Sequence, residues 1–93
     1  MIKSFKNKET EKIFNQEYSL KLPTAIQRTT LRKLWMIDAS QNINDLRIPP
    51  ANHLEKLKGN RNEQYSIRIN DQWRIIFKWA KGHSTNVEII DYH

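Results

Sequence analysis

The sequence predicts a single α+β domain, in which two helices precede an antiparallel sheet. Apolar residues recur at three- and four-residue steps in the first part of the chain, which is the spacing of a buried helix face. From residue 64 onward they alternate with polar residues, which is the spacing of a strand with one buried face. The length of 93 residues fits one domain over residues 1–93 and leaves no room for a second core.

The first expected elements are a short strand over residues 2–5 and a helix capped by Asn7. Two acidic residues in the first turn of this helix, Glu9 and Glu11, suit the positive end of the helix dipole. The inward side of the helix is expected to carry Ile13, Phe14 and Tyr18. A break follows near Pro23, because the residue before a proline disfavours helix.

A second, longer helix is predicted from Thr24 to Ser40. Its buried stripe consists of Ile26, Thr30, Leu31, Leu34 and Ile37. Its outward side is expected to carry the basic residues Arg28, Arg32 and Lys33. Because a short loop joins the two helices, we expect them to pack as an antiparallel pair.

Residues 42–52 are rich in Asn and Pro, which predicts a crossing loop, anchored by Leu46 and Ile48. Three strands are predicted to follow at residues 64–70, 73–79 and 87–92. Turn residues at 70–72 and 81–84 connect them as hairpins. The second half of the chain is therefore a meander of three or four strands, on which the helices pack.

Charge is the clearest compositional signal. The chain has 16 Lys and Arg against 10 Asp and Glu, a net charge of +6, with a pI near 9.8. This indicates a polyanionic partner such as nucleic acid, although a basic protein without such a partner has the same composition. The lack of cysteine excludes disulfides and thiolate metal sites. With no signal-peptide pattern and no run of about 20 apolar residues, we expect a cytoplasmic protein without membrane contact.

The turn at residues 70–72 determines which side chains of the hairpin share a face. Side chains alternate between the faces of a strand, so a slip of one residue inverts the whole strand. A three-residue loop pairs Ile67 with Ile75 and Tyr65 with Phe77, which sends the apolar rows of both strands to one core. A two-residue loop would mix the faces.

The same register sets Arg68 directly opposite Arg74 on the other face of the sheet. Two opposed arginines repel one another, and a phosphate between them would remove this penalty. The planar fork of arginine also suits bidentate binding of phosphate. Alternatively, each arginine pairs with a carboxylate such as Glu88 or Asp91, or points into water.

A second basic cluster precedes the hairpin and consists of Lys56, Lys58 and Arg61, with Gly59 between them. Charged loops are usually only solvated. This one enters the same sheet as the two arginines, which makes the cluster a candidate for RNA contacts.

The histidines favour metal-free chemistry. His93 follows an apolar strand, and imidazole is suited to proton transfer near neutral pH, although a terminal histidine is often frayed. His53, His83 and His93 lack metal-ligand spacing, so no metal site is expected. The glycines, Gly59 and Gly82, form no phosphate-binding loop. The functions that remain possible are metal-free catalysis and binding without catalysis.

Three segments resemble HigB toxins, the plasmid-maintenance killer proteins of the RelE superfamily. They are LKGNR at residues 57–61, SIRINDQWRI at residues 66–75 and DYH at residues 91–93. The combination of the hairpin with the DYH ending is specific, whereas LKGNR alone is not. The resemblance extends over the whole chain, including residues 2–5.

This resemblance implies a RelE-like, microbial-ribonuclease-like fold and an mRNA interferase, which is a ribosome-dependent endoribonuclease. It also implies that the protein uses no metal or cofactor. Its inhibitor would be a helix-turn-helix antitoxin of the HigA type, and operator DNA would be reached only through that antitoxin.

Carried over by position, the catalytic residues of the family fall on Lys58, Arg74, Asp91, Tyr92 and His93. Arg61 and Arg68 fall on RNA contacts.

One position departs from the family pattern. Some members carry a histidine three residues before the position of Lys58, and here that residue is Glu55. His53 lies two residues earlier and, on a strand, would share the face of Glu55. Either Glu55 or His53 therefore supplies the proton transfer, or this member is a weaker nuclease.

The mechanism expected from this resemblance uses Arg74, with Arg68 or Lys58, to hold the phosphate and stabilise the pentavalent phosphorane. His93 would transfer the proton, Asp91 would orient it, and Tyr92 would position or stack a base. The product would be a 2′,3′-cyclic phosphate. Two alternatives are a non-catalytic RNA- or ribosome-binding module and a subunit whose basic surface receives an acidic protein.

Overall fold

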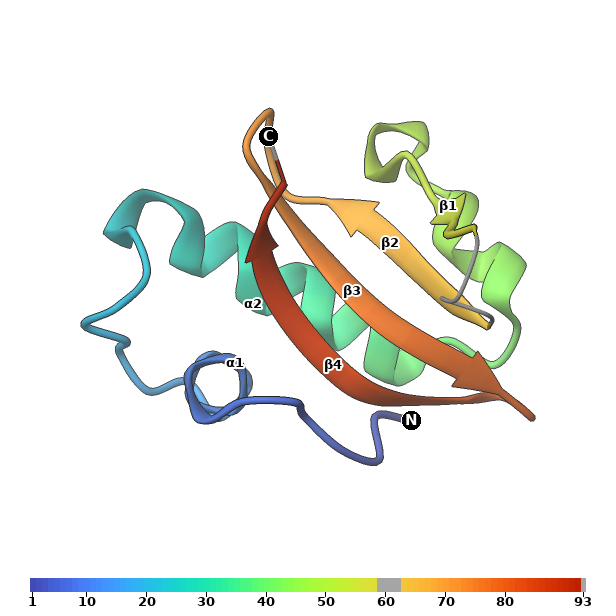
Figure 1. Ribbon diagram of the computed structural model, residues 1–93, viewed down its shortest axis with the longest axis horizontal. Coiled ribbons are helices and arrows are strands. Elements are labelled where there is room, and N and C mark those ends of the chain that lie inside the picture. Colours follow the sequence, from blue (N-terminus) through green and yellow to red (C-terminus); the bar gives the residue numbers. More distant parts are fainter. Residues whose placement is uncertain (59–62, 93) are drawn as a thin grey trace.

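The protein is an α+β domain with one antiparallel sheet, as predicted (Figure 1). The computed structural model describes residues 1–58 and 63–92. In chain order the elements are α1 (Lys8–Phe14), α2 (Thr24–Ala39), the 3-10 helices η1 (Ile43–Arg47) and η2 (Pro50–Asn52), and the strands β1 (Glu55–Lys56), β2 (Gln64–Arg68), β3 (Trp73–Ala80) and β4 (His83–Asp91). The strands lie in sequence order, and α2 runs behind the sheet in Figure 1, which leaves the face toward the viewer without a helix.

Helix α1 begins where the sequence predicts. The Oδ1 atom of Asn7 accepts hydrogen bonds from the backbone N–H of Thr10 at 2.9 Å and from the Thr10 hydroxyl at 2.8 Å. The Thr10 hydroxyl oxygen in turn accepts a bond from the N–H of Ile89 at 3.1 Å. The cap of α1 is thereby joined to β4.

The end of α1 differs from the prediction. The helix ends at Phe14, and Gln16 takes a left-handed conformation (φ 65°), so Tyr18 falls outside the helix and is 59% exposed instead of facing inward. Figure 1 views α1 end-on and α2 from the side, so the two helices cross and do not form the expected antiparallel pair. The connection over residues 15–23 is long enough to permit this crossing.

The N-terminal segment is not the regular strand that we expected over residues 2–5. It makes isolated parallel bridges to β4, from Ile2 to Ser84 and from Phe5 to Val87. Strand β4 is longer than predicted, because it begins at His83 and passes an irregularity in its pairing with β3 between Ile76 and Lys78.

Helix α2 matches its predicted bounds to within one residue, and the predicted stripe is buried or half-buried. The assignment of Lys33 to the outward side is wrong, because this residue is only 5% exposed. This side of α2 does not face solvent, because the segment that carries η1 and η2 lies over it. The Nζ atom of Lys33 donates a hydrogen bond to Oδ1 of Asn52 at 2.5 Å.

Residues 42–52 cross the molecule as predicted, as two short 3-10 helices rather than an irregular loop. Leu46 is buried, but Ile48 is 74% exposed and does not anchor the segment. Ile48 lies in extended conformation between η1 and η2, where the described residues leave most of it uncovered. Asn52 takes the anchoring place, because it is fully buried and its Nδ2 atom donates to the carbonyl of Leu46 at 3.1 Å.

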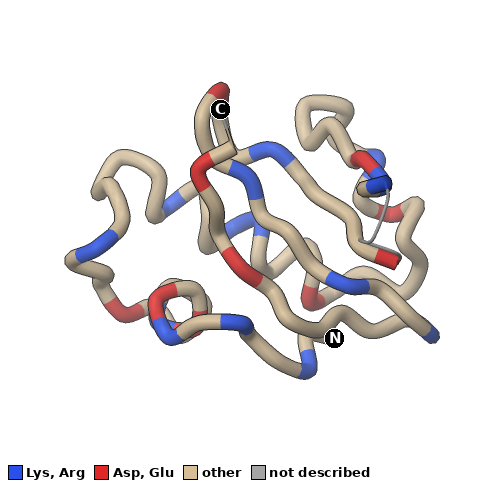
Figure 2. Tube along the Cα trace, viewed as in Figure 1, with Lys and Arg blue, Asp and Glu red and all other residues tan. Residues whose placement is uncertain are grey.

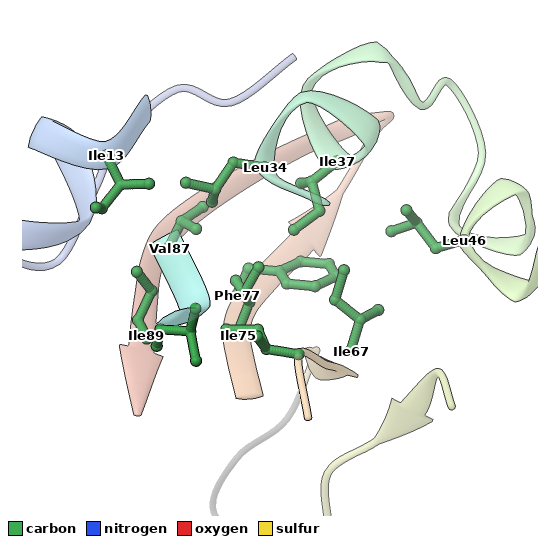
Figure 3. Packing of buried hydrophobic residues seen from close by; sticks show 11 residues of the cluster. Ile13, Leu34, Ile37, Leu46, Ile67, Ile75, Phe77, Val87 and Ile89 are labelled. Carbon is green, nitrogen blue, oxygen red and sulfur yellow. The ribbon is translucent and has the colours of Figure 1, made fainter. Parts of the chain in front are cut away.

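The predicted register of the β2–β3 hairpin is confirmed. Ile67 pairs with Ile75, and Tyr65 pairs with Phe77. The core between α2 and the sheet has Phe77 near its centre, next to Ile37 of α2 (Figure 3). Each fully buried side chain of this kind contributes about 1.5–3 kcal/mol relative to exposure. The described helices include none long and apolar enough to cross a bilayer.

We expect Thr10→Val to lower the free energy of unfolding by about 1–3 kcal/mol, because it leaves the buried N–H of Ile89 unpaired. Thr30→Val is the matched control. The Thr30 hydroxyl is also buried but has no hydrogen-bond partner among the described residues, so its removal should leave stability unchanged or raise it. Urea unfolding measures both variants, and equal losses would contradict the assigned role of Thr10.

Candidate active site

The sheet face opposite α2 carries the two predicted arginines. Arg68 and Arg74 are paired directly across β2 and β3. Figure 2, in the same view as Figure 1, shows basic positions side by side on these strands near the hairpin. The sequence-based register therefore placed both guanidinium groups on the correct face of the sheet.

Arg74 is held from several directions. Its Nη1 atom donates to Oγ of Ser66 at 2.9 Å and to the backbone carbonyl of His53 at 3.3 Å. Its Nη2 atom forms an ion pair with the Glu55 carboxylate at 3.2 Å. The ring of Tyr92 lies with its centroid 5.1 Å from the Arg74 Cζ atom. With only 12% of its side chain exposed, Arg74 is fixed before any ligand arrives.

Glu55 is the more accessible member of its ion pair with Arg74. It lies in β1 opposite Ser66, and its side chain is 51% exposed. A ligand can therefore reach the carboxylate from solvent. The sequence analysis named this residue as a departure from the family pattern and, with His53, as a candidate for the proton transfer.

His53 does not lie on a strand, so the expectation that it shares the face of Glu55 by strand alternation is wrong. It follows η2 in a left-handed conformation (φ 45°), which turns the chain into β1. Its backbone carbonyl, rather than its imidazole, contacts Arg74.

The second arginine has a weaker attachment. Arg68 pairs with Asp71, three residues along the hairpin turn, whose side chain is almost fully exposed. Exposed pairs of this kind contribute about 0–1 kcal/mol, so an incoming phosphate can replace Asp71 at little cost. The alternative that both arginines pair with carboxylates is thus what the structure shows.

The carboxylates that pair with these arginines differ from the two candidates suggested by the sequence. Glu88 pairs with Lys6 at 3.2 Å. Asp91 accepts a hydrogen bond from Nε2 of Gln72 at 3.0 Å.

The end of β4 joins the hairpin turn. The N–H of Tyr92 donates to the carbonyl of Gln72 at 2.6 Å. Asp91 pairs with Trp73, so by strand alternation its side chain leaves the sheet on the Trp73 face, whereas Tyr92 lies on the Arg74 face. The structure thus brings Tyr92, but not Asp91, to Arg74.

The basic cluster before the hairpin is only partly described. Lys56 pairs with Tyr65 at the start of β2, and Lys56 and Lys58 are both exposed. Arg61 and His93 lie outside the described residues, so their assigned roles stay predictions. Lys58 is not among the described residues that contact Arg74. No group of three or more acidic or histidine side chains suited to a metal occurs within residues 1–58 and 63–92.

Sequence reasoning missed Ser66 as a site residue. Its hydroxyl is buried and accepts a hydrogen bond from Arg74. The predicted register already put Ser66 on the arginine face, two residues from Arg68. Its small hydroxyl side chain, on the same face as the two arginines, was the available signal.

Comparisons with known proteins identify the family of this chain. Residues 3–93 match the family described as HigB-like toxin, the RelE-like toxin of the type II toxin–antitoxin system HigB. The chain belongs to the HigB-like toxin family. Toxin HigB-1 of Vibrio cholerae is 41% identical to this toxin over 87 residues, which cover 92% of each chain. Endoribonuclease HigB of Proteus vulgaris is 31% identical over 93 residues, which cover both chains completely.

Two further relatives extend the comparison. An uncharacterized protein of Haemophilus influenzae is 51% identical over 67 residues, which cover 72% of this toxin and 66% of that chain. The structure of the YoeB dimer from Staphylococcus aureus superposes with a TM-score of 0.62 at 24% identity, over 99% of this toxin and 94% of that chain, and shows a shared fold. Membership of a toxin–antitoxin family implies an antitoxin as partner of this toxin.

The contact between Tyr92 and Arg74 should be measurable as a coupling energy. In a double-mutant cycle on urea unfolding, Tyr92→Leu and Arg74→Met should couple by about 0.5–1 kcal/mol, the usual size of a cation–π contact near a surface. Tyr92→Phe retains the ring and should retain most of the coupling. Strictly additive losses for the leucine variant would show that the ring does not stabilise the guanidinium.

Proposed function

We propose that this toxin is a cytoplasmic endoribonuclease that cuts mRNA on the ribosome without a metal ion and thereby stops translation. The observation that carries the proposal is the Arg74 guanidinium, fixed by Ser66 and His53 and in contact with the half-exposed Glu55 carboxylate at 3.2 Å. A phosphodiester bound to Arg74 would lie beside a carboxylate able to accept a proton. The name of the Proteus vulgaris relative, Endoribonuclease HigB, supports the same activity.

The proposed reaction is attack of the ribose 2′-oxygen on the neighbouring phosphorus. Glu55 takes the 2′-hydroxyl proton, the 2′-oxygen bonds to phosphorus, and the bond to the 5′-oxygen breaks. Arg74, assisted by Arg68 after it leaves Asp71, stabilises the extra negative charge of the phosphorane. His93 gives a proton to the departing 5′-oxygen. The products are a 2′,3′-cyclic phosphate and a 5′-hydroxyl.

We prefer Glu55 to His53 as the base, because the carboxylate of Glu55 touches Arg74 whereas His53 contacts it through its backbone carbonyl. A general base must lie within hydrogen-bond reach of the proton that it removes. Glu55 meets this condition for a hydroxyl beside a phosphate held by Arg74.

The remaining predicted residues have supporting roles in this proposal. Tyr92 steadies Arg74 with one side of its ring and positions or stacks a base of the RNA. Asp91 fixes the end of β4 through Gln72, which orients the histidine that follows two residues later. The RNA backbone is contacted by Lys56, Lys58 and Arg61. The inhibitor is a helix-turn-helix antitoxin of the HigA type.

The test of function is induced expression with and without the antitoxin, followed by mapping of mRNA 5′ ends. The proposal expects growth arrest and cuts in translated transcripts that carry 5′-hydroxyl ends, both suppressed by the antitoxin. Cuts with 5′-phosphates that require magnesium would refute the mechanism. Arrest without cuts would identify a non-catalytic ribosome-binding protein.

Glu55→Gln should have opposite effects on catalysis and on binding. The rate of cleavage should fall by about 10²–10⁴-fold, because the general base is lost. Affinity for an RNA with 2′-deoxyribose at the cleavage position should rise, because the negative charge competing for Arg74 is removed. Single-turnover cleavage and equilibrium binding measure the two effects. Glu17→Gln, the same change at an exposed loop position, is the control and should alter neither quantity.

Arg74→Lys should lower the cleavage rate by about 10²–10³-fold, because lysine retains the charge but not the fork that contacts phosphate, Ser66 and Glu55 together. Arg28→Lys makes the same substitution on the exposed side of α2 and should leave the rate unchanged. A rate for Arg74→Lys close to that of the unmodified toxin would show that only net charge matters at this position.

A further inference from the structure

Lys33 is a buried ammonium group outside the site described above. It lies on α2 beside Leu34, which is fully buried. Ion pairs between described residues do not include Lys33, and its hydrogen-bond partner is a neutral amide oxygen, Oδ1 of Asn52 at 2.5 Å. Burial lowers the pKa of Lys33, and the nearby guanidinium groups of Arg32 and Arg68 lower it further.

Considered without its hydrogen bond, a buried ammonium group lowers the stability of the folded state. Transfer of a charge from water to a protein interior is costly, and an apolar side chain of similar length would fill the same space without that cost. What an ammonium adds over an apolar chain is a directional, charge-assisted hydrogen bond to one particular atom. The acceptor, Oδ1 of Asn52, belongs to the segment that leads into the site, which indicates a structural role for the bond.

Asn52 connects Lys33 to the segment that leads into the site. It is fully buried, and its Nδ2 atom donates to the carbonyl of Leu46 at 3.1 Å and to that of Ile48 at 3.5 Å. Its own backbone N–H donates to the carbonyl of Pro49 at 2.9 Å and closes η2. Asn52 is thereby held on α2 by one side-chain atom and on the crossing segment by another.

The residue after Asn52 makes the turn into β1. His53 has a φ of 45°, a left-handed conformation that is unfavourable for a residue with a side chain and persists only where the surroundings impose it. Its carbonyl accepts the Arg74 hydrogen bond at 3.3 Å, and two residues later Glu55 forms the ion pair at 3.2 Å. In Figure 1 the crossing segment leads directly into β1.

We propose that Lys33 and Asn52 are positioning residues: their buried hydrogen bond fixes the turn at His53 so that the Glu55 carboxylate meets Arg74. The inference rests on the proposed role of Glu55 as the general base. Helix α2, whose inner face is packed on the sheet, supplies the rigid end of this connection. A shift of about 1 Å in the base would lower the rate by up to about 10²-fold without any loss of a reacting group.

The first arm of the test compares Lys33→Met with Arg32→Met. Both variants remove one positive charge from neighbouring positions of α2, but Arg32 is exposed. Lys33→Met should lower kcat for cleavage on translating ribosomes by about 10- to 10²-fold, with KM changed less than about twofold and a melting temperature within a few degrees of the unmodified toxin. Arg32→Met should leave kcat unchanged.

The second arm is a double-mutant cycle with Glu55→Gln. If Lys33 acts by placing the carboxylate, Lys33→Met should change the cleavage rate less than about twofold when Glu55 is already glutamine. A general loosening of the fold would instead lower the rate by the same factor in both backgrounds. The cycle therefore separates positioning from a merely structural role.

The outcomes are distinct for the inference and for the function on which it rests. A normal kcat for Lys33→Met together with a slow Glu55→Gln overturns the positioning role and leaves the proposed function intact. A normal rate for Glu55→Gln removes the proposed base and the inference with it. If Lys33→Met does not fold, Lys33→Gln, which keeps a donor of shorter reach, enters the same cycle. Failure of both to fold would make Lys33 a structural residue and overturn the proposal.

Discussion

The pairing of Arg68 with Arg74 across β2 and β3 is the constraint on which the rest of the site depends. The same three-residue turn that sends Ile67 and Ile75 into the core sets the two guanidinium groups opposite one another on the other face. A register without this repulsion would also lose the apolar alignment, because a strand cannot move one row of side chains without moving the other. The packing of the hydrophobic core therefore maintains a cationic face that repulsion between the two arginines would otherwise disfavour.

The two arginines tolerate this arrangement because each has a separate carboxylate. Asp71 is exposed and lies within the turn, whereas Glu55 comes from β1 on the far side of β2. Arg68 is thus easily released, and Arg74 is held by four groups from three parts of the chain. Catalysis through charge stabilisation favours a guanidinium that is held as Arg74 is, since a group fixed in advance needs no reorganisation during the reaction.

The sequence predicted the parts of the molecule in which spacing carries information. The stripe on α2 and the register of the β2–β3 hairpin follow from periods of 3.6 and 2, and both are confirmed. The partner of Arg74 was sought in β4, where Glu88 and Asp91 are conspicuous. It came instead from β1, a strand of two residues, which is too short to show any alternation.

The errors around the crossing segment have the same physical cause. Residues 42–52 have no period, so nothing in the sequence showed that Ile48 is exposed while Asn52 is buried. The burial of Lys33 depends on this segment lying over α2, which is a tertiary contact and leaves no mark on the helical pattern. Tyr18 was placed on a helix that ends earlier, because the left-handed Gln16 is not one of the residues that usually signal a helix end.

The bridges from Ile2 and Phe5 to β4 have a consequence for self-association. A sheet with exposed rows of unpaired backbone groups invites a neighbouring chain to add a strand, and proteins counter this with covering segments or very short outer strands. Here the N-terminal segment covers β4, and the outer strand on the opposite border is β1, with two residues. The described part of the sheet thus exposes few unpaired backbone groups with which another chain could pair. Its basic surface nevertheless stays open to solvent.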